Sequence, residues 1–206
     1  MISETEIKRA PALRISNVVR GRENAGNRVK YFVDPNGHGI EKAIPEDVVL
    51  RRWRRRKLEG FSFHGCRLGP NLWRATIKAF GDDVASLHKL SFNEIDEQRK
   101  YLSGDEVSKH WKLPSNENLT CLLNSISPAQ LELIMDRHNH EDHVNRFGVP
   151  DLFVFAKRSS ADASAAFFRL VEVKRPRERL SKDQQQEIIF LQKIGVPARV
   201  LRLMER

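Results

Sequence analysis

The stretches "GVPDLFVF" (residues 148–155) and "FRLVEVKRPRERLSKDQ" (residues 168–184) decide the fold of this chain. Each contains a short apolar run rich in aromatic and β-branched residues, which predicts two strands that pair across the polar connector "KRSSADAS". A capping box of Ser181 and Gln184 predicts a helix that follows, and "ARVLRL" predicts a last strand. We therefore expect the order β, β, α, β.

Acidic and basic side chains lie at the edges of these apolar runs. The two-residue period of a strand turns Glu172 and Lys174 to one face and Val173 to the other. Asp151 opens the partner strand, so antiparallel pairing would bring its carboxylate near Glu172. Adjacent carboxylates suit a hard divalent cation such as Mg²⁺ or Mn²⁺, and an ammonium beside it could orient a bound water. The plainer alternative is a surface salt bridge between Glu172 and Lys174, with Asp151 serving a turn.

The upstream stretch "IPEDVVLRRWRRRKLEG" (residues 44–60) predicts one helix that begins at Pro45. Helical spacing puts Glu46 on the same face as Val49, Leu50 and Trp53. A carboxylate therefore stands at the end of the apolar stripe of this helix.

The remaining pattern predicts one domain with an insertion. From about residue 72 to 145 the periodicity is helical, and Ser91 with Glu94 fits one of its capping boxes. Residues 1–27 are polar. We expect a polar N-terminal segment over residues 1–27 and a single domain over residues 28–206, with a helical insertion at about 72–145.

The composition favours a polyanionic partner. The 206 residues include 36 Lys and Arg against 27 Asp and Glu, which gives a formal net charge of +9. Such a balance is typical of proteins that bind nucleic acid, although charge alone also allows an anionic membrane. The N-terminus lacks the apolar core of a signal peptide, and no stretch has the ~18 apolar residues of a spanning helix. We expect a cytoplasmic, nucleoid-associated protein or a nuclear one.

Together with "LQKIGVPARVLRL" (residues 191–203), the two opening stretches resemble the virus-type replication-repair nuclease (VRR-Nuc) domain of the PD-(D/E)xK superfamily. Upstream, "IPEDVVLRRWRRRKLEGFSFHG" and "NLWRATIKAF" are similar to the Fanconi-associated nucleases. The resemblance implies an α/β fold of restriction-endonuclease type, with a mixed central sheet flanked by helices and a helical insertion. It also implies a structure-specific DNA endonuclease or exonuclease, acting in repair or replication, that uses Mg²⁺ or Mn²⁺ to hydrolyse phosphodiesters in flapped or branched DNA.

Carried over residue by residue, the resemblance makes Asp151 and Glu172 metal ligands and Val173 a ligand through its backbone carbonyl. It makes Lys174 the group that positions the attacking water. Glu46 would be the acidic residue from the first core helix, although Asp47 and Glu41 compete for that role.

The resemblance also includes Gln184, which matches a polar position that faces the active site from the last helix. The alternative for this residue is capping alone, because Ser-x-x-Gln is a capping box whatever the function. Arg175 departs from the family, which commonly has glycine after the catalytic lysine.

Two basic clusters are candidate DNA-binding surfaces. The first lies on the "RRWRRRK" helix, and its alternative is a solvated helix face; the second follows the catalytic lysine and lies nearer the proposed metal. The predicted DNA-binding residues are Arg51, Arg52, Arg55, Arg175, Arg177, Arg179 and Lys182. The string "HNHEDH" (residues 138–143) allows a zinc hypothesis, but without a cysteine partner or standard spacing a polar helix end is preferred.

Three functions remain open from the sequence. The first is a monomeric nuclease, because the inserted helices would cover the surface through which compact relatives form dimers. The second is a dimeric Holliday-junction resolvase, since a symmetric dimer suits a four-way junction. The third is a catalytically idle DNA-binding module, which intact Asp151, Glu172 and Lys174 argue against.

Overall fold

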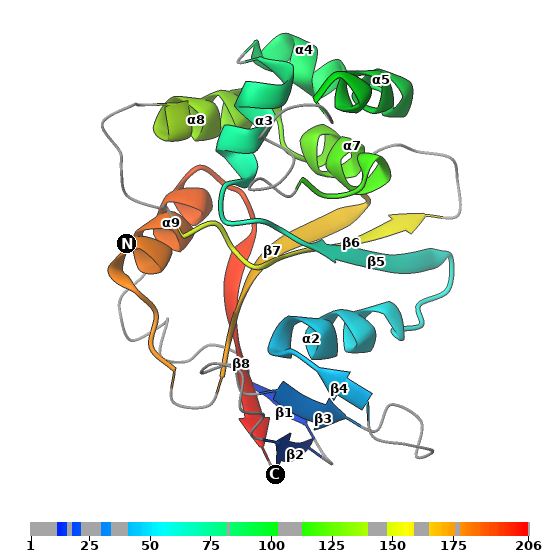
Figure 1. Ribbon diagram of the computed structural model, residues 1–206, viewed down its shortest axis with the longest axis vertical. Helices are drawn as coiled ribbons and strands as arrows, with labels where there is room; N and C mark the ends of the chain where they lie inside the picture. Colours follow the sequence, from blue (N-terminus) through cyan, green and yellow to red (C-terminus); the bar gives the residue numbers. More distant parts are fainter. Residues whose placement is uncertain are drawn as a thin grey trace.

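The structure is a computed structural model that describes residues 12–15, 18–21, 30–33, 41–81, 83–102, 113–139, 148–158, 165–175 and 178–205. A five-stranded mixed sheet with the order β1-β8-β7-β6-β5 forms its centre (Figure 1). The strands are β1 (Ala12–Ile15), β5 (Phe61–Arg67), β6 (Leu152–Arg158), β7 (Phe167–Lys174) and β8 (Ala198–Glu205). Helices pack on both faces, so the predicted α/β fold with a mixed sheet is confirmed.

The predicted pair of central strands is formed by β6 and β7. They run antiparallel, from Leu152 opposite Val171 to Ala156 opposite Phe167. β5 pairs antiparallel with the other edge of β6, whereas β8 runs parallel to β7. A parallel pair needs a crossover, which α9 (Lys182–Lys193) supplies. The β, β, α, β order of the sequence pattern is therefore present.

One face of the sheet is covered by α2 (Pro45–Arg54). The buried side chains of this helix pack against the start of β6 and the end of β7. A Cβ on Gly65 of β5 would lie 2.9 Å from both Leu50 Cδ2 and the carbonyl oxygen of Phe153, so only glycine lets α2 approach this closely. The residues of this core are Val48, Val49, Leu50, Leu152, Val154, Val171, Val173 and Leu203.

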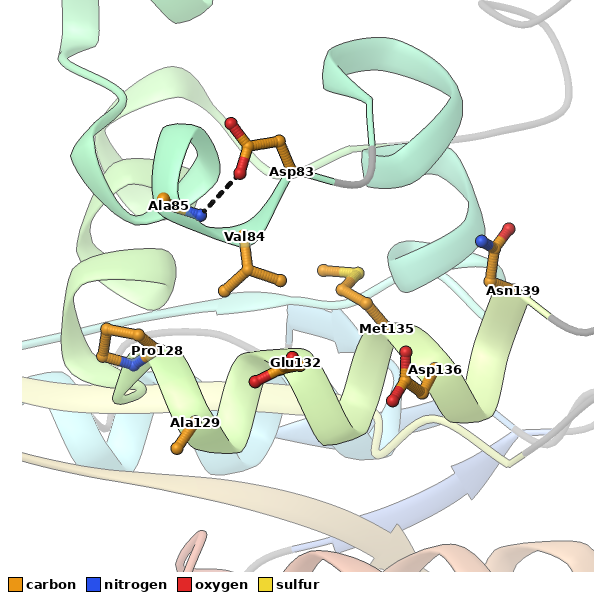
Figure 2. A pocket seen from close by; sticks show the side chains of 9 residues that line it. All are labelled: Asp83, Val84, Ala85, Pro128, Ala129, Glu132, Met135, Asp136 and Asn139. Atoms are coloured by element: carbon orange, nitrogen blue, oxygen red, sulfur yellow. Dashed lines mark hydrogen bonds between the residues drawn. The ribbon is translucent and has the colours of Figure 1, made fainter.

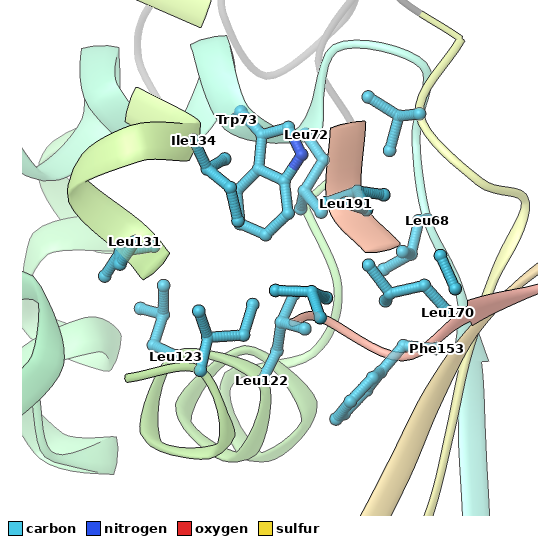
Figure 3. Packing of buried hydrophobic residues seen from close by; sticks show 14 of the residues in the cluster. Leu68, Leu72, Trp73, Leu122, Leu123, Leu131, Ile134, Phe153, Leu170 and Leu191 are labelled. Atoms are coloured by element: carbon cyan, nitrogen blue, oxygen red, sulfur yellow. The ribbon is translucent and has the colours of Figure 1, made fainter. Parts of the chain in front are cut away.

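The opposite face carries the helical insertion, which lies above the sheet in Figure 1. Its helices are α3 (Leu72–Phe80), α4 (Val84–Lys89), α5 (Phe92–Leu102), α7 (Asn116–Ser125) and α8 (Pro128–Asn139). Trp73 and Leu122 of the insertion join Phe153 and Leu170 of the sheet and Leu191 of α9 in one apolar core (Figure 3). The insertion is therefore packed onto the central sheet rather than held apart from it.

The N-terminal strands differ from the expectation of a separate polar segment. β1 lies within residues 1–27 and pairs parallel with β8, with Ala12 opposite Arg202. β2 (Val18–Gly21), β3 (Lys30–Val33) and β4 (Glu41–Ala43) form a second, antiparallel sheet. The run "ALRI" of β1 has only four residues, too few for its alternation to stand out. Among the described residues, no helix is both long and apolar enough to cross a bilayer.

Candidate active site

Asp151 lies directly before β6, at the end of the sheet where β7 finishes. Its Oδ2 accepts a hydrogen bond from the backbone N–H of Val173 at 2.8 Å, and its carbonyl oxygen accepts from the N–H of Leu68 at 2.8 Å. The residue is thus fixed to β7 by its side chain and to the end of β5 by its backbone. The pKa of Asp151 is raised to about 6, chiefly by burial and also by the charge of Glu46, although the Val173 hydrogen bond and the charge of Lys174 lower it.

Glu172 is almost fully buried in β7, with 1% of its surface exposed. Its Oε1 accepts hydrogen bonds from Gln184 Nε2 at 2.6 Å and from Lys174 Nζ at 2.9 Å. Its Oε2 is buried and has no hydrogen-bond partner. The pKa of Glu172 is raised to about 7, chiefly by burial and also by the charge of Asp151, although the hydrogen bond and charge of Lys174 lower it. The pair of Glu172 and Lys174 is therefore buried, so the alternative of a surface salt bridge is wrong.

Lys174 also contacts the carboxylate of Glu178, a residue that the sequence analysis did not single out. Its Nζ lies 3.5 Å from Oε1 of Glu178, whose Oε2 accepts from the backbone N–H of Arg175 at 3.0 Å. Burial alone would lower the pKa of Lys174, but the hydrogen bond and charge of Glu172, with the charge of Glu178, raise it above its ordinary value. The only sequence signal for Glu178 is its position four residues after Lys174. This spacing does not predict a contact unless the path of the chain after β7 is known.

Glu46, at the start of α2, is separated from the site by more than 100 residues of sequence but comes close to it in space. Its charge acts on Asp151, and its Oε2 is buried without a hydrogen-bond partner. The competing acid Asp47 is instead paired with Arg67, whose Nη2 lies 2.5 Å from Asp47 Oδ1. Of these two, Glu46 is the one turned to the site; the side chain of Glu41 lies outside the described residues.

Gln184 both caps α9 and contacts Glu172. Its Oε1 accepts from the N–H of Ser181 at 3.1 Å and its own N–H donates to Ser181 Oγ at 3.2 Å, which completes the capping box of α9. Its Nε2 remains free to donate to Glu172. A Cβ on Gly148 would lie 2.5 to 2.8 Å from Gln184 atoms, so the segment before Asp151 rests directly on this residue.

Whether the candidate site suits a metal ion depends on its carboxylate oxygens. In the described part of the chain no three His, Cys, Asp or Glu side chains are already gathered as a metal site. Two carboxylate oxygens, Glu46 Oε2 and Glu172 Oε2, are nevertheless buried without a hydrogen-bond partner beside Asp151. Hard cations such as Mg²⁺ take oxygen ligands and retain several waters, so the donor set fits such an ion.

The predicted DNA-binding cations lie in two places. Arg51 and Arg52 lie on α2, and Arg55 directly follows it. Arg51 is half-buried and the other two are exposed. Those near the candidate site are Arg175, half-buried after β7, and Arg179 and Lys182, both exposed before or at the start of α9. Arg177 lies outside the described residues.

The first histidine of the "HNHEDH" string takes part in a buried ion-pair network. His138 Nε2 lies 3.1 Å from Glu187 Oε1, and Arg137 Nε donates to Glu187 Oε2 at 2.9 Å. Glu187 belongs to α9 and is fully buried. His138 is therefore in the last turn of α8, as a polar helix end predicts, while residues 140–143 of the zinc hypothesis lie outside the described residues.

A pocket of about 520 Å³ lies between α4 and α8 within the insertion (Figure 2). Its acidic lining residues are Asp83, Glu132 and Asp136, with Val84 and Met135 among the apolar ones. None of the predicted site residues lines it, and its acidic character is the opposite of what a phosphate group needs. The candidate chemistry is therefore at the end of β7 and not in this pocket.

Comparison with known proteins identifies the family. No curated protein matches the sequence significantly. Crystal structures of paFAN1 bound to 5′-flap DNA with a gap, with flaps of one and of two nucleotides, are similar to the chain at 17% and 18% identity and TM-scores of 0.47 and 0.49. The alignments cover 94% and 90% of this chain but 38% and 39% of those chains, so it spans about two fifths of their length. The model of the VRR-NUC domain family matches residues 91–205, more than half of the sequence, and the chain therefore belongs to the VRR-NUC domain family.

Proposed function

We propose that this chain is a divalent-metal-dependent, structure-specific DNA nuclease. The observation that carries the proposal is the pair of buried carboxylate oxygens without hydrogen-bond partners, on Glu46 and Glu172, beside Asp151 and the ammonium of Lys174. Buried acceptors without partners are rare in stable proteins, and an oxygen-binding cation would satisfy both.

Asp151, Glu172 and Glu46 would hold Mg²⁺ or Mn²⁺, with the backbone carbonyl of Val173 as a further ligand. When bound, such a cation supplies Lewis acidity and a water of lowered pKa. Of the three carboxylates, Glu172 is the most rigidly oriented, because Gln184 and Lys174 both donate to its Oε1. Its other oxygen is thereby directed away from these donors.

Lys174 would orient the attacking water and offset charge that develops on the phosphate. In this position its ammonium would act as a hydrogen-bond donor and a charge. Glu172 and Glu178 hold this ammonium from two sides. In the proposed reaction, Gln184 and Glu178 are positioning residues.

The substrate that we propose is flapped or forked DNA bound by a monomer. The net charge of +9 favours a phosphate backbone, and Arg175, Arg179 and Lys182 lie on the segment that follows Lys174. The insertion packs with α9 on one face of the sheet, which supports a monomer acting on an asymmetric substrate. A DNA substrate implies a nucleoid or nuclear location.

Cleavage assays test the proposal. Labelled flap, fork, four-way and duplex DNA would be incubated with Mg²⁺, Mn²⁺ or a chelator, using the wild type and the Asp151→Asn, Glu172→Gln and Lys174→Ala variants. We expect metal-dependent cleavage of flap or fork DNA that all three variants lose and that Asp136→Asn, an exposed acid of the insertion, retains. Substantial cleavage by Glu172→Gln would contradict the site. Binding without cleavage would indicate an idle module, and paired cuts of a four-way junction by a dimer in light scattering would indicate a resolvase.

A further inference from the structure

The face of the sheet that α2 covers is not covered along its whole length. α2 packs on the half that lies near Asp151 and Val173, whereas the half near the end of β6 carries aromatic and arginine side chains. The strand register puts these side chains on one face: Phe61 is opposite Arg158, Phe167 opposite Ala156, and Arg169 opposite Val154. We name this area the arginine–aromatic surface; it consists of Trp53, Arg56, Phe61, Phe63, Arg158, Phe167, Arg169 and Arg199.

The aromatic part of this surface is a connected cluster that remains open to solvent. The ring centroids of Phe61 and Phe63 lie 5.7 and 5.9 Å from that of Phe167, and the ring of Phe63 lies 5.3 Å from Trp53. Phe167 is nonetheless 39% exposed. A large aromatic side chain that is held in place by other rings but leaves much of its surface in water is suited to stacking on another flat group.

Arginine side chains lie around these rings, and no carboxylate is paired with them among the described residues. Arg56 lies 4.9 Å above the ring of Trp53, and Arg158 lies 6.0 Å from the ring of Phe61. Burial lowers the pKa of Arg169, and the neighbouring charges of Arg199 and Arg56 lower it further. The Nε of Arg169 is buried without a hydrogen-bond acceptor. Within the described residues, no carboxylate forms an ion pair with Arg56, Arg158, Arg169 or Arg199.

We propose that the arginine–aromatic surface binds single-stranded nucleic acid, with a base stacked on Phe167 and phosphates held by Arg158, Arg169 and Arg199. Every base has a π-face, so exposed rings beside unpaired cations are what an unpaired strand needs, whereas a duplex hides these faces. A second copy of this chain fits less well, because a symmetric contact would place the arginines against themselves. Phe167 precedes Glu172 by five residues of β7, roughly 17 Å along a strand. The surface is therefore separate from the candidate active site, and binding here does not depend on cleavage.

Fluorescence anisotropy tests this proposal with the full chain and a labelled oligothymidine of about 15 nucleotides. A chelator in the buffer would prevent cleavage, so the result does not depend on the proposed nuclease activity. Phe167→Ala removes the stacking ring, and Phe92→Ala is its matched control because Phe92 is 51% exposed on α5 of the insertion. Arg199→Ala removes an exposed cation of the surface, and Lys193→Ala removes an exposed cation at the end of α9.

Phe167→Ala should weaken binding of the single strand by about 5- to 100-fold, while Phe92→Ala leaves it unchanged. Arg199→Ala should reduce the slope of log affinity against log salt by about 0.7, and Lys193→Ala should not. Wild-type affinity of Phe167→Ala for the single strand would overturn the proposal. An equal loss of affinity for a blunt duplex would also overturn it. So would light scattering that shows a wild-type dimer which Phe167→Ala dissociates, because the ring would then serve dimerisation. If circular dichroism shows that Phe167→Ala is unfolded, the double variant Arg158→Ala and Arg199→Ala, both at exposed positions, decides by the same criteria.

Discussion

Replacing Glu172 with glutamine should make the metal-free protein more stable, by an amount that grows with pH. The side chain is 1% exposed, and burial raises its pKa to about 7 from an ordinary value of 4.5. Glutamine has the shape of the protonated acid, and its amide oxygen can still accept from Gln184 and Lys174. The substitution therefore removes a buried charge without removing its hydrogen bonds.

The sign and size of this change in the free energy of unfolding follow from the pKa of Glu172. A carboxyl group whose pKa is raised on folding contributes stability below its unfolded pKa of 4.5, and that contribution is lost as the pH rises through about 7. At pH 8 the difference between the two pKa values corresponds to about 3 kcal/mol, at 1.36 kcal/mol per unit, and at pH 5 to about 1 kcal/mol. Glu172→Gln should be more stable than the wild type by at most these amounts, because Lys174 loses one of its two carboxylate partners and keeps Glu178.

Urea denaturation in the presence of a chelator, at pH 5 and at pH 8, measures this difference in stability. When Mg²⁺ replaces the chelator, the wild type should become more stable, whereas the variant should hardly change. Glu187→Gln is the matched control, because Glu187 is also a buried glutamate but is paired with Arg137 and His138. Burial would raise the pKa of Glu187, but the hydrogen bonds and charges of His138 and Arg137 lower it. Its stabilisation is present above the unfolded pKa and is lost at lower pH, so Glu187→Gln should destabilise the protein at pH 8 by about 3–5 kcal/mol.

A Glu172→Gln protein that is less stable than the wild type by the same amount at both pH values would refute this reasoning. Such a result would mean that the carboxylate is satisfied in the folded protein and needs no cation. Equal stabilisation of both proteins by Mg²⁺ would refute the assignment of Glu172 as a ligand, even if the nuclease proposal survived with other residues.

Three further predictions concern the surroundings of the site. Glu46→Gln should lose most cleavage activity while Asp47→Asn keeps it, because Asp47 is engaged by a surface arginine; the reverse outcome in the flap assay would move the role by one residue. Gly148→Ala should lower stability by about 1–3 kcal/mol in thermal unfolding, since its Cβ would overlap backbone atoms of Gln184, and an unchanged midpoint would show that the segment can move aside. Arg179→Glu should weaken binding of flap DNA and flatten its salt dependence in anisotropy titrations, whereas an unchanged slope would locate the DNA elsewhere.

The core of the fold could be predicted because its signals are local. Two apolar runs of period two, one capping box and one helix start specify β6, β7, α9 and α2. Each begins where the sequence pattern puts it, but α2 ends at Arg54, before the end of the predicted stretch 44–60. The strand β1 could not be predicted in the same way, since four residues carry little periodicity and its partner β8 lies at the other end of the chain.

In the candidate site, too, the local features could be predicted from the sequence and the contacts between distant segments could not. Glu172 and Lys174 were predicted to share a face because a strand alternates, and their 2.9 Å contact confirms that geometry. The choice between Glu46 and Asp47 could not be made from sequence, because it depends on Arg67, which is 20 residues away and belongs to another element. Glu178 was missed because its contacts arise from a turn.

The buried network of Glu187 and the arginine–aromatic surface were also invisible in the sequence. The acid of the first belongs to α9 and its partners to the insertion, so nothing in the pattern of either helix indicates the pair. The second is assembled from α2 and strands of the main sheet. Contacts between distant segments are set by packing, which a single sequence does not reveal.

The insertion between β5 and β6 divides the acidic groups between two distant parts of the chain, with Glu46 before it and Asp151, Glu172 and Glu178 after it. Contacts of such long sequence separation require the closure of a long loop, which is entropically unfavourable. Neither a nascent chain nor a proteolytic fragment that lacks one part would hold the whole set of carboxylates. A nuclease activity of the proposed kind would then appear only in the completely folded chain.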